Sequence, residues 1–546
     1  MASVWSALGI ARLQQLIGED VLERLEMLLP ALRPDELDPD QIYSRAGLTQ
    51  IFEAFAGAAM MEKSAFRKEL FNSLDEQTVN ALLAKVGGIG ASSTFANKVD
   101  HLARKSWRSR PFAEAVAEVL DLPDEILPAS VDVVPAEQLL PAAERPYKVL
   151  KDYQTPVYHE AIRRLAVERQ RFIVQMPTGS GKTRTATEII TTFLNESPPG
   201  TIVFWLAHAE ELCEQAYEAF RDVWPHVARR SARLVRCWGK GAKLPTPDED
   251  SAFVIGSFQT LYAALVKQAA GFARLRERIT LVVIDEAHKV LAPTYQQVTE
   301  ALLGETTKVV GLTATPGRGA DDEEQNAALA NFFFGEIVNI ASGDASVIDY
   351  LRARRVLSET TYVPLMTAQS YALSAKEKIH LERFFDLPAG VLKRIGDDDV
   401  RNVEIVKRLE AEAAAGRQII FFGCSVEHSK FICALLTFLG IRAAHVDGST
   451  PKSQRAAFID EFKNSRIQII CNYGILSTGF DAPKTDVVFI SRPTGSIVLY
   501  SQMIGRGLRG PAIGGTERCT VIDVKDNIVG FSDEHAVFEH FAGYYG

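Results

Sequence analysis

Two adjacent carboxylates stand at the end of an apolar run in the middle of the chain. The stretch VVIDEAHK at 282–289 places Asp285 and Glu286 directly after three β-branched residues, with His288 two positions further on. Such a run predicts a buried strand, and burying a carboxylate is costly unless a cation or another partner receives it. We therefore expect Asp285 and Glu286 to face a positive charge where this strand ends.

A glycine-rich turn further upstream predicts the source of that charge. The stretch FIVQMPTGSGKTRTATEII at 172–190 has the pattern of a strand, a turn and a helix. Backbone N–H groups of such a turn and the helix N-terminus bind phosphates, and the lysine reaches the terminal phosphates. Met176 stands where the strict pattern has glycine. The predicted phosphate-binding residues are Thr178, Gly179, Ser180, Gly181, Lys182 and Thr183.

Together the two stretches predict an ATP site that binds Mg²⁺. Thr183 and Asp285 provide the oxygen ligands that Mg²⁺ prefers, and we expect Asp285 on a strand next to the one that precedes the turn. Glu286 is placed to polarise the water that attacks the terminal phosphate. We therefore predict ATP and Mg²⁺ as cofactors, with Lys182, Asp285 and Glu286 as catalytic residues.

The elements that position these residues divide the chain into three stretches. The chain has 546 residues, which is too long for one hydrophobic core. Residues 1–145 show helical spacing of apolar residues, as in LQQLIGEDVLERLEMLL, and end in a Pro-containing segment at 127–146 that predicts a linker. Strand-like runs alternate with helical patterns in the rest of the chain. They are FIVQM, TIVFWLA, FVIGSF, LVVIDEA and KVVGLTA, then QIIFFG, RAAHVDG, IQIICN, DVVFIS and CTVIDV.

This alternation predicts parallel sheets covered by helices on both faces. We therefore expect an α/β protein with an all-helical N-terminal domain at 1–145 and two parallel-sheet domains at 146–345 and 346–530. A short tail at 531–546 follows them.

Composition restricts the class of protein further. With 47% hydrophobic and 24% charged residues the chain has the balance of an ordinary globular protein. The net charge of −9 gives no overall attraction to nucleic acid, so such binding requires a local positive groove. The six cysteines form no CxxC pair, so we expect buried reduced thiols and no zinc. With no membrane-length apolar run and no signal peptide, we expect a cytoplasmic protein without membrane contact.

Residues 148–530 resemble the superfamily two helicases and translocases. Ten short motifs occur in the family's order: LKDYQ, GSGKT, LAHAEELCEQ, GSFQTL, DEAH, GLTATP, FFGCSVEH, HVDGST, ILSTGFDAP and YSQMIGRGLRG. The resemblance implies two RecA-like domains that hydrolyse ATP between them and move on nucleic acid. Within the superfamily the chain is most similar to bacterial RadD-type and XPB-like DNA helicases. DNA is favoured over RNA because these relatives act on DNA and because 313–315 reads TAT rather than SAT.

The same resemblance implies roles for further residues. Arg506 and Arg509, three apart on one helical face, would reach the phosphates across the cleft between the domains, and Asp481 would face that cleft. Gln154 would contact the adenine base. Four residues would couple ATP hydrolysis to movement of the domains, and among them Gln502 would hydrogen-bond His288. These residues are His288, Thr313, Thr315 and Gln502. Nucleic-acid contacts are expected from His208, Gln259, Thr260 and Thr478.

The N-terminal stretch allows two interpretations. Its segment 98–110 gathers Lys98, Arg104, Lys105, Arg108 and Arg110 around Trp107, and basic residues with an aromatic can contact phosphates and stack on bases. A solvated helix face with a core tryptophan is the favoured alternative, since 1–145 has roughly 14 basic against roughly 22 acidic residues. The whole chain is then either a motor on DNA, single-stranded or forked, or a DNA-gated ATPase that controls a separate effector or repair protein through residues 1–145.

Overall fold

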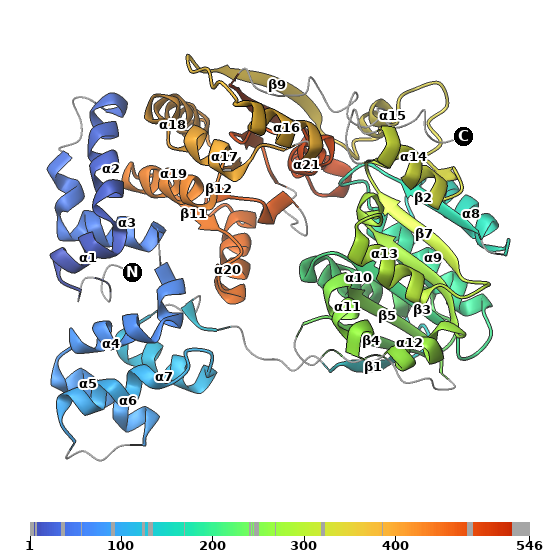
Figure 1. Cartoon of the computed structure of the whole chain (residues 1–546), viewed down its shortest axis with the longest axis horizontal. Coiled ribbons are helices and arrows are strands. Elements are labelled where there is room, and N and C mark those ends of the chain that lie inside the picture. Colours follow the sequence, from blue (N-terminus) through green and yellow to red (C-terminus); the bar gives the residue numbers. More distant parts are fainter. Residues whose placement is uncertain are drawn as a thin grey trace.

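Two mainly parallel sheets and a group of N-terminal helices make up the chain (Figure 1). The computed structural model describes residues 5, 8–33, 39–55, 57–88, 93–122, 126–128, 135–168, 170–239, 242, 244, 250–267, 269–317, 323–384, 386–477 and 484–526. The expected tail at 531–546 lies outside these residues. Across the described residues, no helix has the length and apolar character needed to cross a membrane.

The first sheet contains eight strands of the described residues, in the order β1-β4-β5-β3-β6-β7-β2-β8. Its apolar side chains alternate between two faces: Trp205 packs with α8, α9 and α10, whereas Phe204 packs with α11 to α14. The sheet is therefore buried on both sides, as its nearly continuous apolar strands require. The strands are β1 (Glu137–Leu140), β2 (Arg171–Gln175), β3 (Ile202–Ala207), β4 (Ala232–Cys237), β5 (Ala252–Ser257), β6 (Ile279–Asp285), β7 (Lys308–Thr313) and β8 (Ile337–Val338). The helices are α8 (Gln154–Leu165), α9 (Lys182–Glu196), α10 (Glu210–Val227), α11 (Phe258–Lys267), α12 (Ala269–Arg276), α13 (Pro293–Leu302) and α14 (Glu323–Phe332).

The second sheet contains six strands within the described ranges, in the order β11-β12-β10-β13-β14-β9, and all its neighbouring pairs are parallel. Ile420 faces α20 and α21, and Phe421 faces α18 and α19. The strands are β9 (Glu359–Met366), β10 (Ile419–Phe422), β11 (Ala443–Val446), β12 (Ile469–Asn472), β13 (Val487–Ile490) and β14 (Arg518–Lys525). The helices are α15 (Val347–Ala353), α16 (Ala375–Phe384), α17 (Ala389–Gly396), α18 (Asp399–Ala414), α19 (Val426–Phe438), α20 (Lys452–Lys463) and α21 (Ile497–Ile504). The predicted α/β fold with two parallel sheets is confirmed.

The sequence prediction missed four strands, namely β1, β4, β8 and β9. Three of them, β1, β8 and β9, lie at the edges of the two sheets. An edge strand pairs on one side only and remains partly exposed, so its residues need not form a continuous apolar run. In β9, for example, no residue is buried.

The predicted linker at 127–146 contains the edge strand β1. Residues 137–140 pair antiparallel with β4, and the indole Nε1 of Trp224 donates to the carbonyl of Pro141 at 2.6 Å. The amide of Ala143 donates to the carbonyl of Ala228 at 2.7 Å. This part of the N-terminal stretch therefore belongs to the first sheet and is not helical. With one buried residue among four, it gave no strand signal in the sequence.

The N-terminal helices form two groups (Figure 1). The first group packs on the second sheet domain: Arg24 pairs with Asp399 at 2.7 Å, Arg33 pairs with Glu410 at 2.8 Å, and apolar side chains of both parts share one core. The second group lies further out. The helices are α1 (Ile10–Ile17), α2 (Glu19–Leu32) and α3 (Arg45–Phe55), then α4 (Ser64–Asn72), α5 (Glu76–Val86), α6 (Phe95–Arg104) and α7 (Arg110–Leu120).

Candidate nucleotide site between the two sheets

The glycine-rich turn joins β2 to α9, as predicted. Gly179 and Gly181 have φ of +88° and +84°, a region in which a Cβ is strained, so glycine suits both positions. Lys182 begins α9, which leaves the free N–H groups of the first helical turn facing the turn. Met176 is fully buried in the core of the first sheet, which accounts for an apolar side chain where the strict pattern has glycine.

Asp285 ends β6 at the same edge of the sheet. β7 lies between β6 and β2, so the expectation of a directly neighbouring strand is wrong. Parallel strands nevertheless end at one edge, and Asp285 remains close enough to interact with Lys182. Burial raises the pKa of Asp285 to about 6, against the lowering effect of Lys182.

Glu286 follows in the left-handed region, with φ of +51°. Its backbone N–H donates to Oδ1 of Asp285 at 3.0 Å, a contact that orients the Asp285 carboxylate. Burial acts to raise the pKa of Glu286, but Lys182 and neighbouring positive charges outweigh it, and the pKa is lowered to about 2. Glu286 is therefore ionised at neutral pH.

His288 contacts the carboxylate of Glu286 and the end of β7. Its Nδ1 lies 3.2 Å from Oγ1 of Thr313 and 3.4 Å from Oε2 of Glu286. The Thr313 hydroxyl donates to the carbonyl of Thr315 at 2.9 Å. Burial lowers the pKa of His288 to about 3. Its ring is therefore neutral at physiological pH, and its contacts with Glu286 and Thr313 are those of an uncharged imidazole.

The hydrogen bond expected between His288 and Gln502 is not made. Nε2 of His288 and Nε2 of Gln502 are both buried, and within the described residues neither has a hydrogen-bond partner. The two side chains come from different domains. The coupling roles of His288, Thr313, Thr315 and Gln502 stay predictions.

The second domain brings Arg506 and Arg509 to this edge, but not on a helix. α21 ends at Ile504; Arg506 lies in the turn that follows and Arg509 in a β-bridge with Leu357, so the expected helical face is wrong. Glycines explain the difference: a Cβ built on Gly505 would lie 2.5 Å from Cβ of Thr178, and one on Gly507 would lie 2.2 Å from Sγ of Cys519. The close approach that these glycines permit, rather than helical spacing, positions the arginines.

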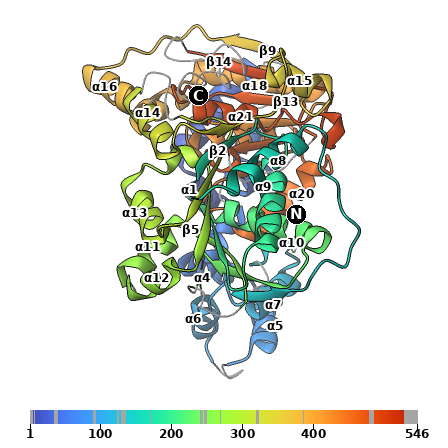
Figure 2. The same ribbon diagram turned by 90° about the vertical axis from the view of Figure 1, so that its right-hand side faces the viewer.

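Arg509 approaches the phosphate loop, and Arg506 lies close enough to Glu286 to interact with its charge. Cγ of Arg509 lies 3.3 Å from where a Cβ of Gly179 would stand. Burial lowers the pKa of Arg506 to about 10, although the carboxylate of Glu286 acts to raise it. Burial alone lowers the pKa of Arg509 to about 10. In both views of the molecule α21 of the second domain lies against the end of β2 in the first (Figures 1 and 2).

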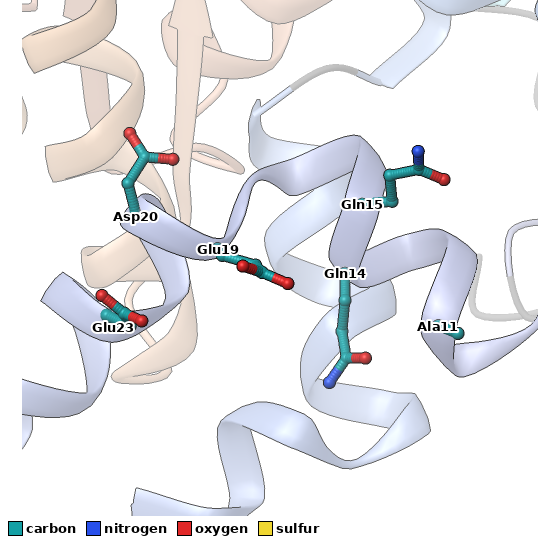
Figure 3. Close-up of a pocket in the computed structure, with 6 residues that line it drawn as sticks. All are labelled: Ala11, Gln14, Gln15, Glu19, Asp20 and Glu23. Carbon is teal, nitrogen blue, oxygen red and sulfur yellow. The ribbon is translucent and has the colours of Figure 1, made fainter.

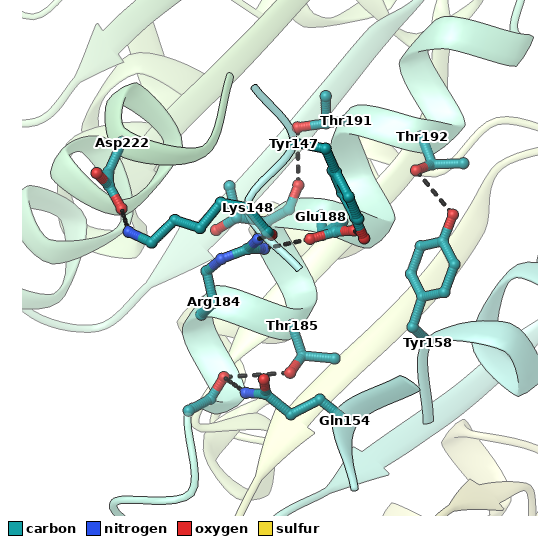
Figure 4. Close-up of polar contacts among 12 residues, drawn as sticks. Tyr147, Lys148, Gln154, Tyr158, Arg184, Thr185, Glu188, Thr191, Thr192 and Asp222 are labelled. Carbon is teal, nitrogen blue, oxygen red and sulfur yellow. Dashed lines mark hydrogen bonds and ion pairs between the residues drawn. The ribbon is translucent and has the colours of Figure 1, made fainter. Parts of the chain in front are cut away.

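Gln154 begins α8 and touches the phosphate loop from the other side (Figure 4). Its Nε2 donates to the carbonyls of Ser180 at 3.4 Å and Gly181 at 3.3 Å, and its Oε1 accepts from the amide of Lys151 at 3.0 Å. The hydroxyl of the preceding Tyr153 donates to the carbonyl of Ser180 at 2.9 Å. The segment before α8 is thus attached directly to the loop.

Of the residues expected to contact nucleic acid, His208, Gln259 and Thr260 lie near one another, and His208 also contacts Lys289 beside the candidate site. Nε2 of His208 lies 2.8 Å from Nζ of Lys289, and Nε2 of Gln259 donates to the carbonyl of His208 at 2.8 Å. The hydroxyl of Ser257 donates to Oγ1 of Thr260 at 2.9 Å. Burial, followed by the charge of Lys289, lowers the pKa of His208 to about 4. Their contacts with nucleic acid stay predictions, and Thr478 and Asp481 lie outside the described residues.

Sequence reasoning missed residues that support this arrangement. Lys289 stands next to DEAH but belongs to no motif, and its charge lowers the pKa of both Glu286 and His208. Arg455 of α20 pairs with Glu211 of α10 at 2.9 Å and so joins the two domains. No local pattern signals a pair whose members lie so far apart in the chain.

The residues at this edge fit a nucleotide with Mg²⁺. Thr183 in the first turn of α9 and Asp285 provide hard oxygen donors, and Mg²⁺ bound with substrate phosphates needs only one or two protein ligands. In the described part of the chain no three His, Cys, Asp or Glu side chains cluster as a metal site of their own. All six cysteines are buried and none forms a disulfide, which confirms the expected thiols.

An open cavity of about 670 Å³ lies along α1 and α2 and differs in character (Figure 3). Its lining residues are Ala11, Gln14, Gln15, Glu19, Asp20 and Glu23. Because its charged side chains are all acidic, this cavity is unsuited to phosphate groups. The edge formed by β2, β6 and α21 is therefore the candidate nucleotide site.

Two protein-family models match the two domains that form this site. "Type III restriction enzyme, res subunit" matches residues 147–318, and "Helicase conserved C-terminal domain" matches residues 401–510. With the parallel sheets and the site geometry, these matches define the class of the fold: the two domains match the tandem RecA-like domains of helicases.

Individual relatives agree with this class. A 51.5 kDa protein of a Lactococcus phage (isolate 7-9) is 28% identical over 337 residues, which are 62% of this chain and 62% of that protein. The putative ATP-dependent helicase IRC3 of Saccharomyces cerevisiae is 25% identical over 373 residues, which are 66% of this chain and 49% of that protein. The chain thus matches only about half to three-fifths of these relatives' lengths. The DNA-bound Type ISP restriction-modification enzyme LlaBIII shares 16% identity and a TM-score of 0.49 over 73% of this chain and 30% of its own.

Proposed function

We propose that the chain is a DEAH-box DNA helicase or translocase of the RadD-type and XPB-like kind, acting in DNA repair or phage defence. One observation supports the motor most directly. Lys182, Asp285 and Glu286 of the first domain lie at the edge where Arg506 and Arg509 of the second domain approach the phosphate loop. A catalytic centre divided between two domains links ATP hydrolysis to their relative movement.

The proposed roles follow from where these residues lie. The loop 178–181 and Lys182 would bind the phosphates, and Thr183 and Asp285 would hold Mg²⁺, which neutralises phosphate charge when bound. Glu286, kept ionised by Lys182 and its neighbours, would orient the attacking water and accept its proton. Arg506 and Arg509 would stabilise the charge that develops on the transferred phosphoryl group, since a guanidinium stays charged and grips phosphate oxygens in pairs.

We propose that His208, Gln259, Thr260 and Thr478 hold the DNA backbone and that Asp481 faces the cleft. The proposed domain division is a helical accessory domain at 1–145, RecA-like domains at 146–345 and 346–530, and a tail at 531–546, with β1 assigned to the sheet of the first RecA-like domain because of its pairing with β4.

Measurement of ATP hydrolysis with different nucleic acids tests the substrate. We expect single-stranded or forked DNA to stimulate hydrolysis more than RNA of the same sequence, because the TAT of 313–315 and the RadD-type resemblance favour DNA. Equal or greater stimulation by RNA would contradict the assignment to DNA while leaving the motor intact.

The alternative is a DNA-gated ATPase that controls a separate effector through the N-terminal helices. The acid-lined cavity on α1 and α2 favours it, because a basic protein partner fits such a surface better than DNA does (Figure 3). A strand-displacement assay separates the two functions. Unwinding supports the motor, whereas DNA-stimulated hydrolysis without unwinding or translocation supports the switch.

A further inference from the structure

The phosphate-loop helix carries a buried carboxylate that the proposed chemistry does not use. Glu188 lies in the middle of α9 and is only 2% exposed. Burying an ionised carboxylate is unfavourable unless a cation and hydrogen bonds compensate, so its partners show what holds it there. Arg184, one turn earlier on α9, pairs with it at 2.5 Å, and the hydroxyl of Tyr147 donates to its Oε1 at 2.5 Å.

These contacts attach the start of the segment 147–154 to α9 (Figure 4). Besides pairing with Glu188, Arg184 donates from Nη2 to the backbone carbonyl of Lys148 at 2.8 Å. Arg184 follows Lys182 and Thr183 directly in the first turn of α9. One carboxylate thus holds, through Arg184 and through Tyr147, two consecutive residues of a segment that has no helix or strand of its own.

The other end of the segment is attached to the same helix start. Tyr153 and Gln154 donate to the carbonyls of Ser180 and Gly181, next to the N-terminus of α9. Between these two attachments the backbone at 148–153 is irregular. Lys151 bonds Gln154 within the segment, and Asp152 pairs with Arg354 at 2.9 Å. The attachments to α9 therefore add to the contacts that set the position of Gln154 relative to the phosphate loop.

We propose that Glu188 is a positioning residue for the nucleotide: through Arg184 and Tyr147 it fixes the segment 147–154 against α9 and so sets the preference of the site for ATP over GTP. The inference rests on the proposed function, in which Gln154 contacts the base. Glu188 itself would touch neither base nor phosphate. A base contact discriminates only if its donors and acceptors are held in place, because a loosely held amide can turn to suit either base.

The test compares Glu188→Gln and Tyr147→Phe with Tyr158→Phe in the full-length protein. Glu188→Gln keeps the size of the side chain but removes the charge that pairs with Arg184. Tyr158 provides a matched control, because its hydroxyl also bonds α9, lying 3.1 Å from Oγ1 of Thr192, but it lies beyond the segment 147–154. The measurements are kcat and KM for ATP and for GTP at saturating DNA.

For Glu188→Gln we expect KM for ATP to rise roughly tenfold, as for the loss of a charged hydrogen bond, while kcat changes little. The ratio of kcat/KM for ATP to that for GTP should fall, since a loosened Gln154 loses discrimination rather than chemistry. Tyr147→Phe should shift both quantities in the same direction by a smaller factor and removes only one hydroxyl, so it tests the inference even if Glu188→Gln folds poorly. Tyr158→Phe should leave the ratio unchanged.

A wild-type protein that hydrolyses no ATP would contradict the proposed function itself. A wild type that hydrolyses ATP and GTP equally well would overturn the positioning inference alone. So would a Glu188→Gln or Tyr147→Phe variant that lowers the rates with both nucleotides by the same factor, because a purely structural contact affects both alike.

Discussion

Buried charges occur in two places in this protein, and the two places are built differently. In the second domain Arg401 and Asp526 are both fully buried, and the guanidinium donates from Nε and Nη2 to the two carboxylate oxygens at 2.8 Å each. Although burial acts to lower the pKa of Arg401, Cys424 and Asp526 outweigh it and the pKa is raised. In the cleft, by contrast, burial prevails and lowers the pKa of Arg506 and Arg509 to about 10.

The comparison separates buried charges that stabilise the fold from buried charges that we expect to bind a ligand. A fork-to-fork pair compensates much of its desolvation, and further bonds from Arg401 to the carbonyl of Ser491 and from Thr367 to Asp526 complete the group within the fold. The cleft gathers cations of two domains around acids whose own pKa values are displaced in opposite directions. Such displaced pKa values are typical of functional sites, and an anionic ligand with its metal ion would compensate them.

The largest effect is expected where the cleft charges take part in chemistry. Lys182→Ala, or Glu286→Gln, should reduce ATP hydrolysis by a factor on the order of 10² or more, because each removes electrostatic stabilisation of the reacting phosphate. Glu286→Gln should still bind a fluorescent ATP analogue, since Asp285 and Thr183 hold the metal ion. Glu300→Gln, at an exposed position of α13, provides the control. Near-normal hydrolysis in either cleft variant would contradict the assignment of the site.

A smaller effect is expected from the second domain's side of the cleft. Arg509→Ala should lower kcat by a factor on the order of 10 to 10², with nucleotide affinity changed much less, because the contact strengthens chiefly in the transition state. Steady-state kinetics and equilibrium binding measure the two quantities. Arg394→Ala removes a largely exposed arginine of the same domain and should change neither. If Arg509→Ala weakens binding as much as turnover, the arginine binds the ground state only.

The Arg401–Asp526 pair should affect the stability of the fold and not ATP hydrolysis. Asp526→Ala leaves Arg401 buried without its carboxylate, and we expect it to lower the free energy of unfolding by about 3–5 kcal/mol. Urea denaturation measures this loss, with ATP affinity of the folded fraction unchanged. Asp460→Ala breaks the exposed pair of Asp460 with Arg466 and should cost less than about 1 kcal/mol. An Asp526→Ala protein of normal stability would show that burial alone does not identify the charges that hold this fold.

The smallest effect is expected in the basic segment 98–110. Lys98 is buried and bonded to Asn80 and Glu76, and Arg108 pairs with Glu62 at 3.0 Å. Trp107 is 3% exposed and packs on Phe112, so it has no free face for a base. The favoured interpretation, a core tryptophan, is therefore confirmed.

We therefore expect the salt dependence of DNA binding to stay nearly unchanged when four basic residues of this segment are neutralised together. These residues are Arg104, Lys105, Arg108 and Arg110. Each phosphate contact that is lost would reduce the slope of log K against log salt concentration by roughly 0.7 to 0.9. Binding measurements over a range of salt concentrations detect such a change. Substitution suits this test better than truncation at Tyr147, because removing α1 to α3 would expose the apolar face of α18 and α19. A clearly reduced slope would indicate that the N-terminal helices contact DNA and would contradict this prediction.

The sequence by itself determined the local parts of this protein. The phosphate loop, the carboxylates of 285–286 and ten of the strands follow from residues adjacent in the chain, since backbone preference and apolar periodicity act over short distances. The edge strands β1, β8 and β9 gave no such signal, because pairing on one side leaves their residues partly exposed.

The tertiary structure alone decided how distant parts meet. It placed β7 between β6 and β2, ended α21 before Arg506, brought Gly505 close to Thr178, and joined the N-terminal helices to the second domain through a shared core. It also brought Glu188 of α9 to Tyr147. Each of these contacts depends on packing between residues far apart in sequence, so the spacing of residues along the chain does not predict it.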